Sequence, residues 1–448
     1  MSRPVLRTAL TAVVSVVTGL AAMLATLTVS APAQAANVAT PGHFTGYGFD
    51  QCLAPTQRAM NAWLHHSPFL AVGIYISGDS RGCRHQPNLS RNWVATQLRS
   101  GWRLLPITLG PQASCSPHFP RYGNDETINP RPGRANDYAA ARVQGRAEAG
   151  KAVRAARALG ISARSTLWYD IEGFDHTRLR CRESALAFLS GWTFRLHRLN
   201  YVSGVYSSVG SGIKILDDAR VKRPGKFHLP DRIWLARWDG KANTSSSYIR
   251  NDGWRPGGRV KQYQGGHNET WGGVTINIDR NFLDVGKGFW ARPESHCQGT
   301  PVSFSQYPPI TSTTVNAELV TALQCLLQER DLYGGRLHGR YTERLAAGIR
   351  AWRQQRGFAV NGNWGRRQWT SLLSAGRGPI LKYGSAGGYV RRVQRALNAA
   401  SPTAELRANG LFKGSTKSAV RAYQRKVGVG ANGIVGPTTW RALRTGRR

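Results

Sequence analysis

Residues 166–172 read Thr-Leu-Trp-Tyr-Asp-Ile-Glu, and this stretch decides how the N-terminal part of the chain is interpreted. An apolar run of this length predicts a β-strand. Asp170 and Glu172 lie two residues apart, so on an extended strand both side chains point to the same face. The stretch therefore predicts a strand that carries a pair of carboxylates at its carboxyl end.

Comparable apolar runs recur on both sides of this strand, and helical patterns separate most of them. Further strands are expected at Phe44 to Asp50, Ala71 to Ser77, Arg103 to Leu109, Val202 to Ser207, Ile233 to Trp238, Val260 to Tyr263 and Thr275 to Asp279. Helices are expected at Thr56 to His65, Arg91 to Ser100, Asn136 to Leu159 and Glu183 to Leu199. Alternation of this kind implies parallel strands. The connections after Trp238 are rich in Gly, Asn and Ser and show no helical period. The sequence predicts an α/β fold, a TIM-like (β/α) barrel with missing helices in its last third, over residues 43–292.

The C-terminal part of the chain repeats itself. Residues 339–369 align with residues 410–440 at one constant offset, which superposes Trp352 on Tyr423 and Trp369 on Trp440. A helix-like stretch precedes each copy. The pattern predicts two small all-α three-helix domains, over residues 315–375 and 379–445. A Pro-, Ser- and Thr-rich stretch over residues 298–314 is expected to be the linker before them.

The first 35 residues have the order of a signal peptide. Arg3 and Arg7 precede an apolar run that ends in Ala33-Gln34-Ala35, an A-x-A cleavage site. A transmembrane anchor is the alternative, but no positive stop-transfer cluster follows the run. We expect export, a location at the cell wall, and no stable membrane insertion.

Six cysteines in the mature region indicate disulfides in an exported chain. Sequence alone leaves about 15 pairings open. Pairing between neighbours is preferred because it would staple loops and a domain junction: Cys52 with Cys83, Cys115 with Cys181, and Cys297 with Cys325. The cysteines show no metal-ligand spacing, so neither a metal nor another cofactor is expected.

The formal net charge of +37 points to polyanionic partners. In a cytosolic protein it would indicate nucleic acid. Export replaces that partner with the anionic polymers of the wall, so no nucleic acid is expected. The alternative is that the arginine content reflects genomic base composition and that the side chains are merely solvated.

Several carboxylates stand at the predicted carboxyl ends of barrel strands, the rim where barrel enzymes place their catalytic residues. Paired carboxylates suit glycoside hydrolysis, in which one protonates the leaving oxygen and the other stays ionised. The alternative is a structural pair held by arginines such as Arg237. Aromatic and polar residues near the strand ends could form a platform for sugar rings, although most strand aromatics are simply core. The expected binding residues are Tyr47, Tyr75, Tyr206, Trp238, Asp239 and Tyr263.

Four motifs in order carry a resemblance that covers most of residues 43–290: Gly46-Tyr-Gly-Phe-Asp50, Tyr169-Asp-Ile-Glu172, Trp234-Leu-Ala-Arg-Trp238, and Gln262-Tyr-Gln264 followed by Ile278-Asp-Arg-Asn281. They resemble the exported glycoside-hydrolase-like family of actinobacteria, which is similar to the family 25 muramidases. The resemblance implies that Glu172 is the general acid. It implies that Asp170, Asp50 and Asp279 position the sugar or support an oxazolinium-like intermediate. Gln51, Cys52 and Leu53 depart from the muramidase pattern after the first-strand aspartate.

The last repeat resembles the peptidoglycan-binding domain family through Asn409-Gly-Leu-Phe412, Ala419-Val-Arg-Ala-Tyr-Gln424 and Asn432-Gly-Ile-Val-Gly-Pro-Thr-Thr-Trp440. The first repeat is more degenerate, with Arg366 and Arg367 where the second has Pro437 and Thr438. Together these features predict a monomeric, secreted, wall-associated glycoside hydrolase-like protein whose partner is peptidoglycan. The alternative is a non-catalytic wall-binding protein that holds glycan in the barrel groove.

Overall fold

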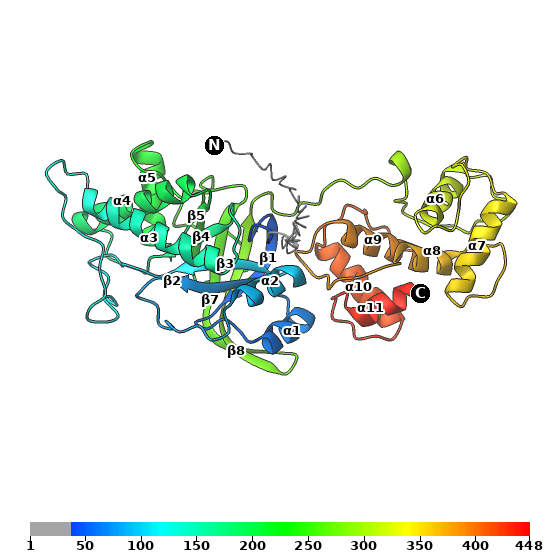
Figure 1. Cartoon of the computed structure of the whole chain (residues 1–448), viewed down its shortest axis with the longest axis horizontal. Helices are drawn as coiled ribbons and strands as arrows, with labels where there is room; N and C mark the ends of the chain where they lie inside the picture. Colours follow the sequence, from blue (N-terminus) through cyan, green and yellow to red (C-terminus); the bar gives the residue numbers. More distant parts are fainter. Residues whose placement is uncertain (1–36) are drawn as a thin grey trace, which may run out of the picture. The chain divides into compact units, whose positions relative to one another are not determined.

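The computed structural model describes residues 37–448, and the expected signal peptide lies outside the described residues. The strands of the N-terminal part close into a barrel in the order β1 to β8 (Figure 1). They are β1 (Phe44–Asp50), β2 (Ala71–Ser77), β3 (Arg103–Thr108), β4 (Thr166–Asp170), β5 (Val202–Ser208), β6 (Arg232–Ala236), β7 (Gly258–Trp271) and β8 (Val274–Val285). Strands β1 to β7 are parallel to their neighbours in chain order, whereas β8 is antiparallel to both β7 and β1.

Helices follow the first five strands, and the described chain has none between β6 and β7 or between β7 and β8. They are α1 (Gln57–His66), α2 (Arg91–Ser100), α3 (Ala139–Ala158), α4 (Leu179–Arg198) and α5 (Gly212–Lys222). The predicted barrel with missing helices in its last third is therefore confirmed, and α5 is a helix that the sequence reading did not include. Local signals set the helix starts, because the Thr56 and Ser90 hydroxyls accept from the backbone amides of Ala59 and Trp93.

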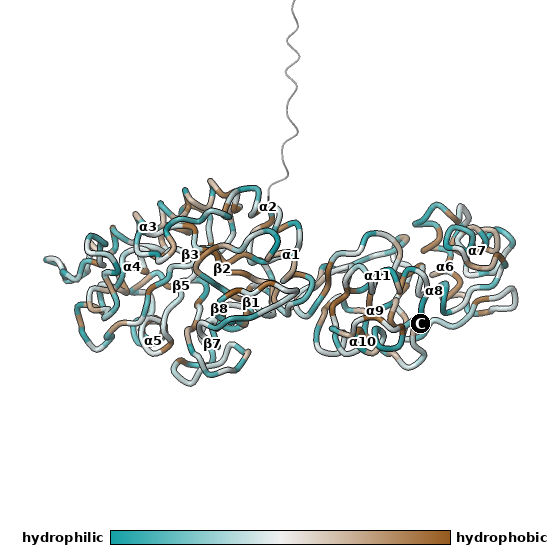
Figure 2. The backbone as a smooth tube through the Cα atoms, turned by 90° about the horizontal axis from the view of Figure 1, so that it is seen from below, coloured by the Kyte–Doolittle hydropathy of each residue, from teal (hydrophilic) through white to brown (hydrophobic). Residues whose placement is uncertain are grey.

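Aromatic side chains fill the barrel and cover its outside. Trp168 and Trp234 are fully buried, and their rings meet edge to face with centroids 5.5 Å apart. Outside the barrel, Phe49 packs against Trp63 of α1 at a centroid distance of 4.7 Å. Figure 2 shows the hydrophobic colouring of a core strand such as β2. Side chains alternate along a strand. On β1, Asp50 and the other even-numbered residues point into the barrel, whereas Phe49 and the other odd-numbered residues point outward to the helices.

The β7–β8 hairpin is longer than the sequence predicted. Its ladder runs from Gly258 and Val285 out to Trp271 and Val274, and Gly272-Gly273, both at positive φ, make the turn. Polar residues dominate the outer half, where Arg280 contacts Glu269 and His267 lies 2.9 Å from the same carboxylate. The hydrophobic pattern therefore stops well before the hydrogen-bonded ladder does.

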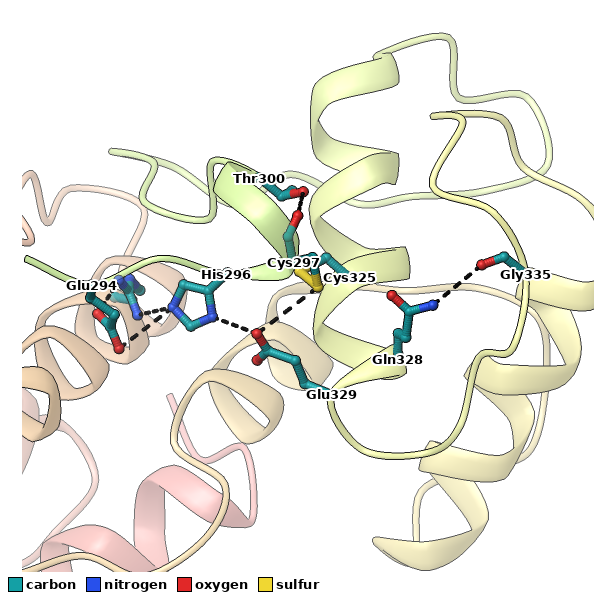
Figure 3. The surroundings of a disulfide bond; sticks show 9 residues. Glu294, His296, Cys297, Thr300, Cys325, Gln328, Glu329 and Gly335 are labelled. Atoms are coloured by element: carbon teal, nitrogen blue, oxygen red, sulfur yellow. Dashed lines mark hydrogen bonds and ion pairs between the residues drawn. A yellow bond between two sulfur atoms is a disulfide. The ribbon is translucent and has the colours of Figure 1, made fainter.

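The three preferred disulfides are present: Cys52–Cys83, Cys115–Cys181 and Cys297–Cys325. The third ties the segment after the barrel to α6 (Ala317–Gln328) (Figure 3). Beside it, His296 bridges two carboxylates, with Nδ1 at 2.9 Å from Glu329 and Nε2 at 3.5 Å from Glu294.

The C-terminal part consists of two three-helix units, which confirms the predicted all-α domains. Helices α6, α7 (Glu343–Gln355) and α8 (Arg366–Leu373) form the first, and α9 (Gly388–Ala400), α10 (Gly414–Lys426) and α11 (Pro437–Arg444) form the second. Their equivalence extends to single contacts. The indole of Trp369 donates to the Pro308 carbonyl at 2.9 Å, and that of Trp440 donates to the Pro379 carbonyl at 2.8 Å.

The stretch over residues 298–314 contributes Val302, Tyr307 and Ile310 to the core of the repeats, where all three are buried. Ile310 also forms an isolated bridge with Trp364, which matches the bridge of Leu381 with Val435 in the second repeat. The division of the chain into domains at the stated limits stays a prediction. Among the described residues, no helix is long and apolar enough to cross a membrane.

Lys382 of the second repeat is 1% exposed. Its Nζ donates to the backbone carbonyls of Ser67 at 2.8 Å, Phe69 at 3.2 Å and Trp63 at 3.4 Å, at the end of α1. Burial lowers the pKa of this ammonium well below its usual range. Three acceptors match the three donors of a lysine, so the ammonium is enclosed without leaving a donor unpaired.

Candidate active site

The four predicted carboxylates meet at one end of the barrel. Asp50 ends β1, Asp170 ends β4, and Glu172 follows two residues later. Asp279 lies on β8 directly opposite Asp50 in the antiparallel register. Asp50, Glu172 and Asp279 line one cavity of about 270 Å³. The sequence identified Asp50, Asp170 and Glu172 because the carboxyl ends of parallel strands share one rim. Asp279 reaches the same rim from the middle of an antiparallel strand, not from the strand end that the sequence predicted.

Asp50 is 5% exposed and is held by two amide side chains from the closing hairpin. Its Oδ1 accepts from Asn281 Nδ2 at 2.6 Å, and both of its oxygens lie 3.4 Å from Gln262 Nε2. Asn281 is itself fixed, because its Oδ1 accepts from the Trp234 indole at 2.8 Å. The packed interior of the barrel therefore sets the position of the first-strand carboxylate.

Asp170 is 1% exposed and is only half satisfied. Its Oδ2 accepts from the Tyr75 hydroxyl at 3.2 Å, while Oδ1 has no hydrogen-bond partner among the described residues. Gln112 fixes the backbone around it: Nε2 donates to the Asp170 carbonyl at 2.7 Å, and Oε1 accepts from the Glu172 amide at 2.8 Å. The spacing of the two carboxylates along the strand end is thus clamped by one glutamine.

All four carboxyl groups have raised pKa values. Burial raises the pKa of Asp50 and Asp170 well above their usual range, and the neighbouring charges of Asp279 and Glu172 respectively add to this. Burial raises the pKa of Asp279 to about 6. Burial also raises the pKa of Glu172, against a lowering by Arg121, a raising by Asp279 and a lowering by His118. Each group therefore holds a proton at higher pH than a free carboxyl.

Glu172 also lines a second cavity, of about 440 Å³, together with Tyr206, Trp238 and Tyr248. Trp238 is 67% exposed, which is unusual for a side chain of its size. Its indole donates to Gln262 Oε1 at 2.9 Å, and the Tyr206 hydroxyl donates to the same atom at 3.0 Å. Gln262 therefore links the aromatic cavity to Asp50, and Glu172 stands between the two cavities.

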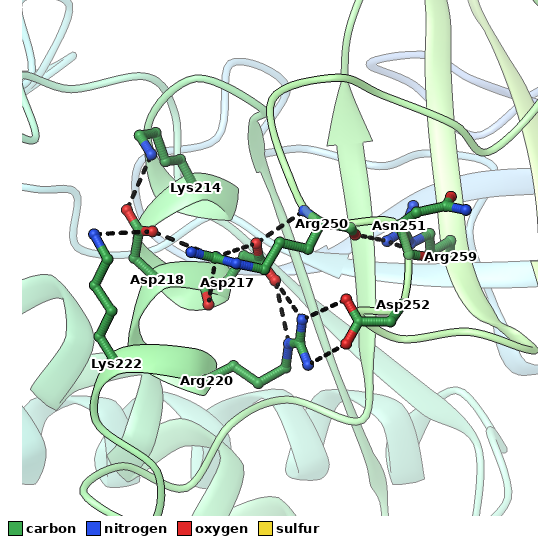
Figure 4. A network of polar contacts seen from close by, with 9 residues as sticks. All are labelled: Lys214, Asp217, Asp218, Arg220, Lys222, Arg250, Asn251, Asp252 and Arg259. Atoms are coloured by element: carbon green, nitrogen blue, oxygen red, sulfur yellow. Dashed lines mark hydrogen bonds and ion pairs between the residues drawn. The ribbon is translucent and has the colours of Figure 1, made fainter.

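The loop that carries Tyr248 is held by an ion-pair network on α5 (Figure 4). Arg250 pairs with Asp217 at 2.8 Å, and its backbone amide donates to the same carboxylate at 3.0 Å. Arg220 bridges Asp217 and Asp252, at 3.0 Å to each. A loop without helix or strand is thereby fixed beside the second cavity.

Three of the predicted binding residues line the cavities and three do not. Tyr75 lines the first cavity, and Tyr206 and Trp238 line the second. Tyr47 lies on the outward-facing side of β1. Its ring packs against those of Phe282 and Tyr383, with ring centroids 5.3 and 5.6 Å away. Tyr263 follows the inward-pointing Gln262, so it lies on the outer face, where burial raises its pKa to about 12. Asp239 forms an ion pair with the buried Lys261 at 2.8 Å instead.

Sequence reasoning did not assign roles to Gln112, Gln262 and Asn281. Gln262 and Asn281 fall within the quoted motifs, but their amides have no titratable chemistry that would single them out. Gln112 follows the third strand at the same rim as the carboxylates, and that position is the one signal that could have identified it. Its contacts join residues about sixty positions apart in the chain. Local patterns do not reveal such contacts.

A closed barrel with buried carboxylates at its carboxyl-end rim is an arrangement that suits glycoside hydrolysis. Residues 61–283 match the family model described as Rv2525c-like, glycoside hydrolase-like domain, and residues 386–443 match that of the putative peptidoglycan binding domain. The chain therefore contains an Rv2525c-like, glycoside hydrolase-like domain followed by a peptidoglycan-binding domain.

One curated relative matches a short part of the chain. The N-acetylmuramoyl-L-alanine amidase CwlL of Bacillus licheniformis is 40% identical over 75 residues, which are 16% of this chain and 21% of the amidase. The chain thus spans about a fifth of the length of that relative.

Among solved structures, an uncharacterized B. stearothermophilus protein aligns with 17% identity and a TM-score of 0.33, over 53% of this chain and 95% of that one. The Mycobacterium tuberculosis Tat-secreted protein Rv2525c, in complex with L-tartrate, aligns with 13% identity and a TM-score of 0.36, over 55% of this chain and 98% of that one.

Proposed function

We propose that the protein is a secreted enzyme that cleaves the glycan strands of peptidoglycan, with Glu172 as the general acid. The observation that carries the proposal is the position of Glu172, which lines both cavities and has a raised pKa. A saccharide that occupies both cavities places a glycosidic bond beside this carboxyl group. A proton held at higher pH than usual is what a general acid requires.

The chemistry follows from the roles of the neighbouring groups. Glu172 gives its proton to the glycosidic oxygen as the bond to the anomeric carbon breaks, and water completes the hydrolysis at that carbon. Asp170 lines neither cavity and its unpartnered Oδ1 is buried, so its proposed part is to support, through space, the positive charge that develops at the anomeric carbon. Asp50 and Asp279, joined across the β1–β8 register, are proposed to position the sugar.

The other parts of the chain support a location at the wall. We propose that residues 1–35 direct export and are cleaved after Ala35, and that the protein acts as a monomer. The C-terminal domain match and the three disulfides agree with an extracellular, wall-associated protein. The net charge of +37 favours retention by anionic wall polymers.

The test compares the full-length mature protein with the Glu172→Gln variant on purified sacculi. New reducing ends, measured by mass spectrometry, should appear with the wild type and fall at least a hundredfold with Glu172→Gln. Glu405→Gln, a change at an exposed carboxylate of the second repeat, is the matched control and should release as much as wild type.

The second candidate is a non-catalytic protein that holds glycan in the same groove, and the exposed Trp238 beside the cavity favours it. This reading predicts that wild type releases no reducing ends from several wall types, while the protein still sediments with sacculi. That result would reject the enzyme proposal and leave the binding role.

A further inference from the structure

Arginine side chains gather where the two three-helix repeats meet. Three of them, Arg330, Arg392 and Arg444, contact residues 374–377, the segment that leads out of α8. Arg356, the residue after α7, lies beside them: burial lowers its pKa, and the charges of Arg330 and Arg444 lower it further. We call these four residues the arginine cluster.

The segment after α8 brings three guanidinium groups together through its backbone carbonyls. Arg392 of α9 donates to two of these carbonyls at 2.7 and 2.9 Å, Arg444 of α11 to one at 3.2 Å, and Arg330 to one at 3.3 Å. A Cβ on Gly376 would lie 3.7 Å from a terminal nitrogen of both Arg330 and Arg392. Basic side chains commonly cap a helix C-terminus, but Arg356 contacts no carbonyl of this segment, so capping does not explain the whole cluster.

Carboxylates do not neutralise the arginine cluster. Among the residues that the structure describes, none of its four members forms an ion pair with an acidic side chain. Residues 315–448 contain 24 lysines and arginines against 5 aspartates and glutamates, so acidic partners are scarce there. On the barrel, by contrast, Arg220 and Arg250 share the carboxylate of Asp217, at 3.0 and 2.8 Å. Like charges held together without a counter-charge cost free energy, which a bound anion would offset.

Three members of the cluster keep accessible N–H donors. Arg330 and Arg356 are exposed, and Arg444 is half-buried. Arg330 gives one of the five donors of its guanidinium to a carbonyl. The Arg356 guanidinium lies over the Trp352 ring, with Cζ 4.4 Å from the ring centroid, and this contact positions the group without using its N–H donors. The cluster therefore combines unneutralised charge with donors that a ligand can reach.

We propose that the arginine cluster is a binding site for the phosphate groups of an anionic wall polymer, separate from the barrel cleft. Arginine suits phosphate because its planar donors form paired hydrogen bonds with phosphate oxygens. A polymer with one phosphate in each repeat unit supplies several negative charges, as four neighbouring arginines require. The inference rests on the proposed location at the wall, but not on hydrolysis.

The test measures binding of soluble poly(glycerol phosphate) to the full-length mature protein by titration calorimetry. The combined changes Arg330→Gln, Arg356→Gln and Arg444→Gln should weaken binding by about tenfold or more. Arg392 is left in place because its two carbonyl contacts hold the segment after α8.

The matched control removes the same charge elsewhere in the second repeat. The combined changes Arg407→Gln, Arg421→Gln and Arg425→Gln affect three exposed arginines and should leave the affinity within about twofold of wild type. Equal weakening in the control would show that bulk charge binds the polymer and would overturn the proposed site. Absence of polymer binding by the wild type would overturn it as well.

Arg356→Gln alone guards against loss of folding, because this side chain holds no carbonyl of the segment. It should weaken polymer binding by about threefold while the thermal unfolding midpoint stays at the wild-type value. Unchanged binding in both this variant and the triple cluster variant would overturn the proposal.

Two further probes decide the class of ligand. Polygalacturonate carries carboxylates in place of phosphates, and if it binds as tightly as poly(glycerol phosphate), the site is not a phosphate site. A DNA oligonucleotide that binds more tightly than either polymer would assign the cluster to nucleic acid and overturn the wall-polymer proposal. Glu172→Gln should bind poly(glycerol phosphate) like wild type, so failure of hydrolysis and failure of this site are recognised separately.

Discussion

Two buried glutamines of the second repeat are fully hydrogen-bonded, whereas two buried polar groups at the carboxyl-end rim of the barrel, which we call its mouth, are not fully hydrogen-bonded within the described chain. In the repeat, Gln424 Oε1 accepts from the Gly433 amide at 2.9 Å, and its Nε2 donates to the Ile434 carbonyl at 2.8 Å and the Thr439 hydroxyl at 3.0 Å. Gln394 holds the Gly410 turn in the same way, with its amide oxygen accepting from Gly410 at 2.9 Å. Both glycines lie at positive φ, where a side chain would be strained.

In the mouth of the barrel, some buried polar atoms have no hydrogen-bond partner among the described residues. Among these atoms are Asp170 Oδ1 and Gln51 Oε1. A closed network stabilises a turn, whereas an open one costs stability and offers atoms to a ligand. The comparison indicates that the glutamines of the repeat serve the fold, and it agrees with the binding and catalytic roles proposed for the polar groups of the mouth.

The first repeat shows that such a fold-holding network can be rebuilt. Arg353 occupies the position that matches Gln424, contacts the Ala359 carbonyl, and donates to the Asn363 carbonyl at 2.8 Å. The matching bridge residue is Trp364 where the second repeat has Val435. The fold of the first repeat is therefore kept with different side chains.

Among the changes that test this contrast between repeat and mouth, Gln424→Ala should have the largest effect on stability. The change removes three hydrogen bonds and leaves the buried Gly433 amide without an acceptor, which should cost the second repeat about 3 kcal/mol. Hydrogen exchange of peptides that cover residues 424–440 measures this loss, and sedimentation with sacculi should weaken.

The control for this change is Gln354→Ala, at an exposed glutamine of α7, which should alter exchange by less than about 0.5 kcal/mol. If Gln424→Ala is as harmless as the control, the closed network does not hold the repeat together.

The regular part of the fold was predictable from the sequence, because hydrophobic periodicity and helix caps are local signals. The strands Phe44–Asp50 and Ala71–Ser77 were predicted to the residue. The outer half of β7 and β8 was not, since its residues are polar and held by a two-stranded ladder that leaves no hydrophobic pattern. Helix α5 was missed among the connections after β5.

The candidate site was predictable only in part, for the same reason. Carboxylates at strand ends can be read from their position, so Asp50, Asp170 and Glu172 were found together. Asp279 was expected to end a strand but lies in the middle of the antiparallel β8, opposite Asp50. The direction of each side chain decided which predicted aromatic residues line a cavity. Trp238 lines one, whereas Tyr47 points outward from β1. The loops that bring Arg81 and Arg121 to the first cavity have no periodic signal, and only the closed barrel brings them to the carboxylates.

Ionising a buried carboxyl group of the mouth should carry a measurable stability cost, which Asp279→Asn would reveal. The raised pKa of about 6 means that the folded state binds this proton more tightly than the unfolded state does. Stability is therefore lost as pH rises from about 4 through 6. The variant lacks this loss, so its advantage over wild type should be near zero at pH 4 and reach about 3 kcal/mol at pH 8.

Urea denaturation at a series of pH values measures this advantage, with Glu405→Gln as the control that should follow wild type throughout. A constant difference across the series would show that Asp279 carries no titration cost, and the contrast between mouth and repeat would then rest on hydrogen bonding alone.

The smallest effect concerns Arg121, a loop residue whose positive charge acts on Glu172. Arg121 lowers the pKa of Glu172, so Arg121→Gln should raise that pKa and move the alkaline limb of kcat/KM for sacculus hydrolysis to higher pH, by less than about one unit. The rate itself should fall if Arg121 binds substrate, but the position of the limb reports on Glu172 independently of that loss. Arg84→Gln, whose arginine lies outside both cavities and pairs with Asp125, should leave the limb where it is. A limb that stays in place or moves to lower pH in Arg121→Gln would mean that the limb does not report the proton of Glu172, and another group of the mouth would have to be the acid.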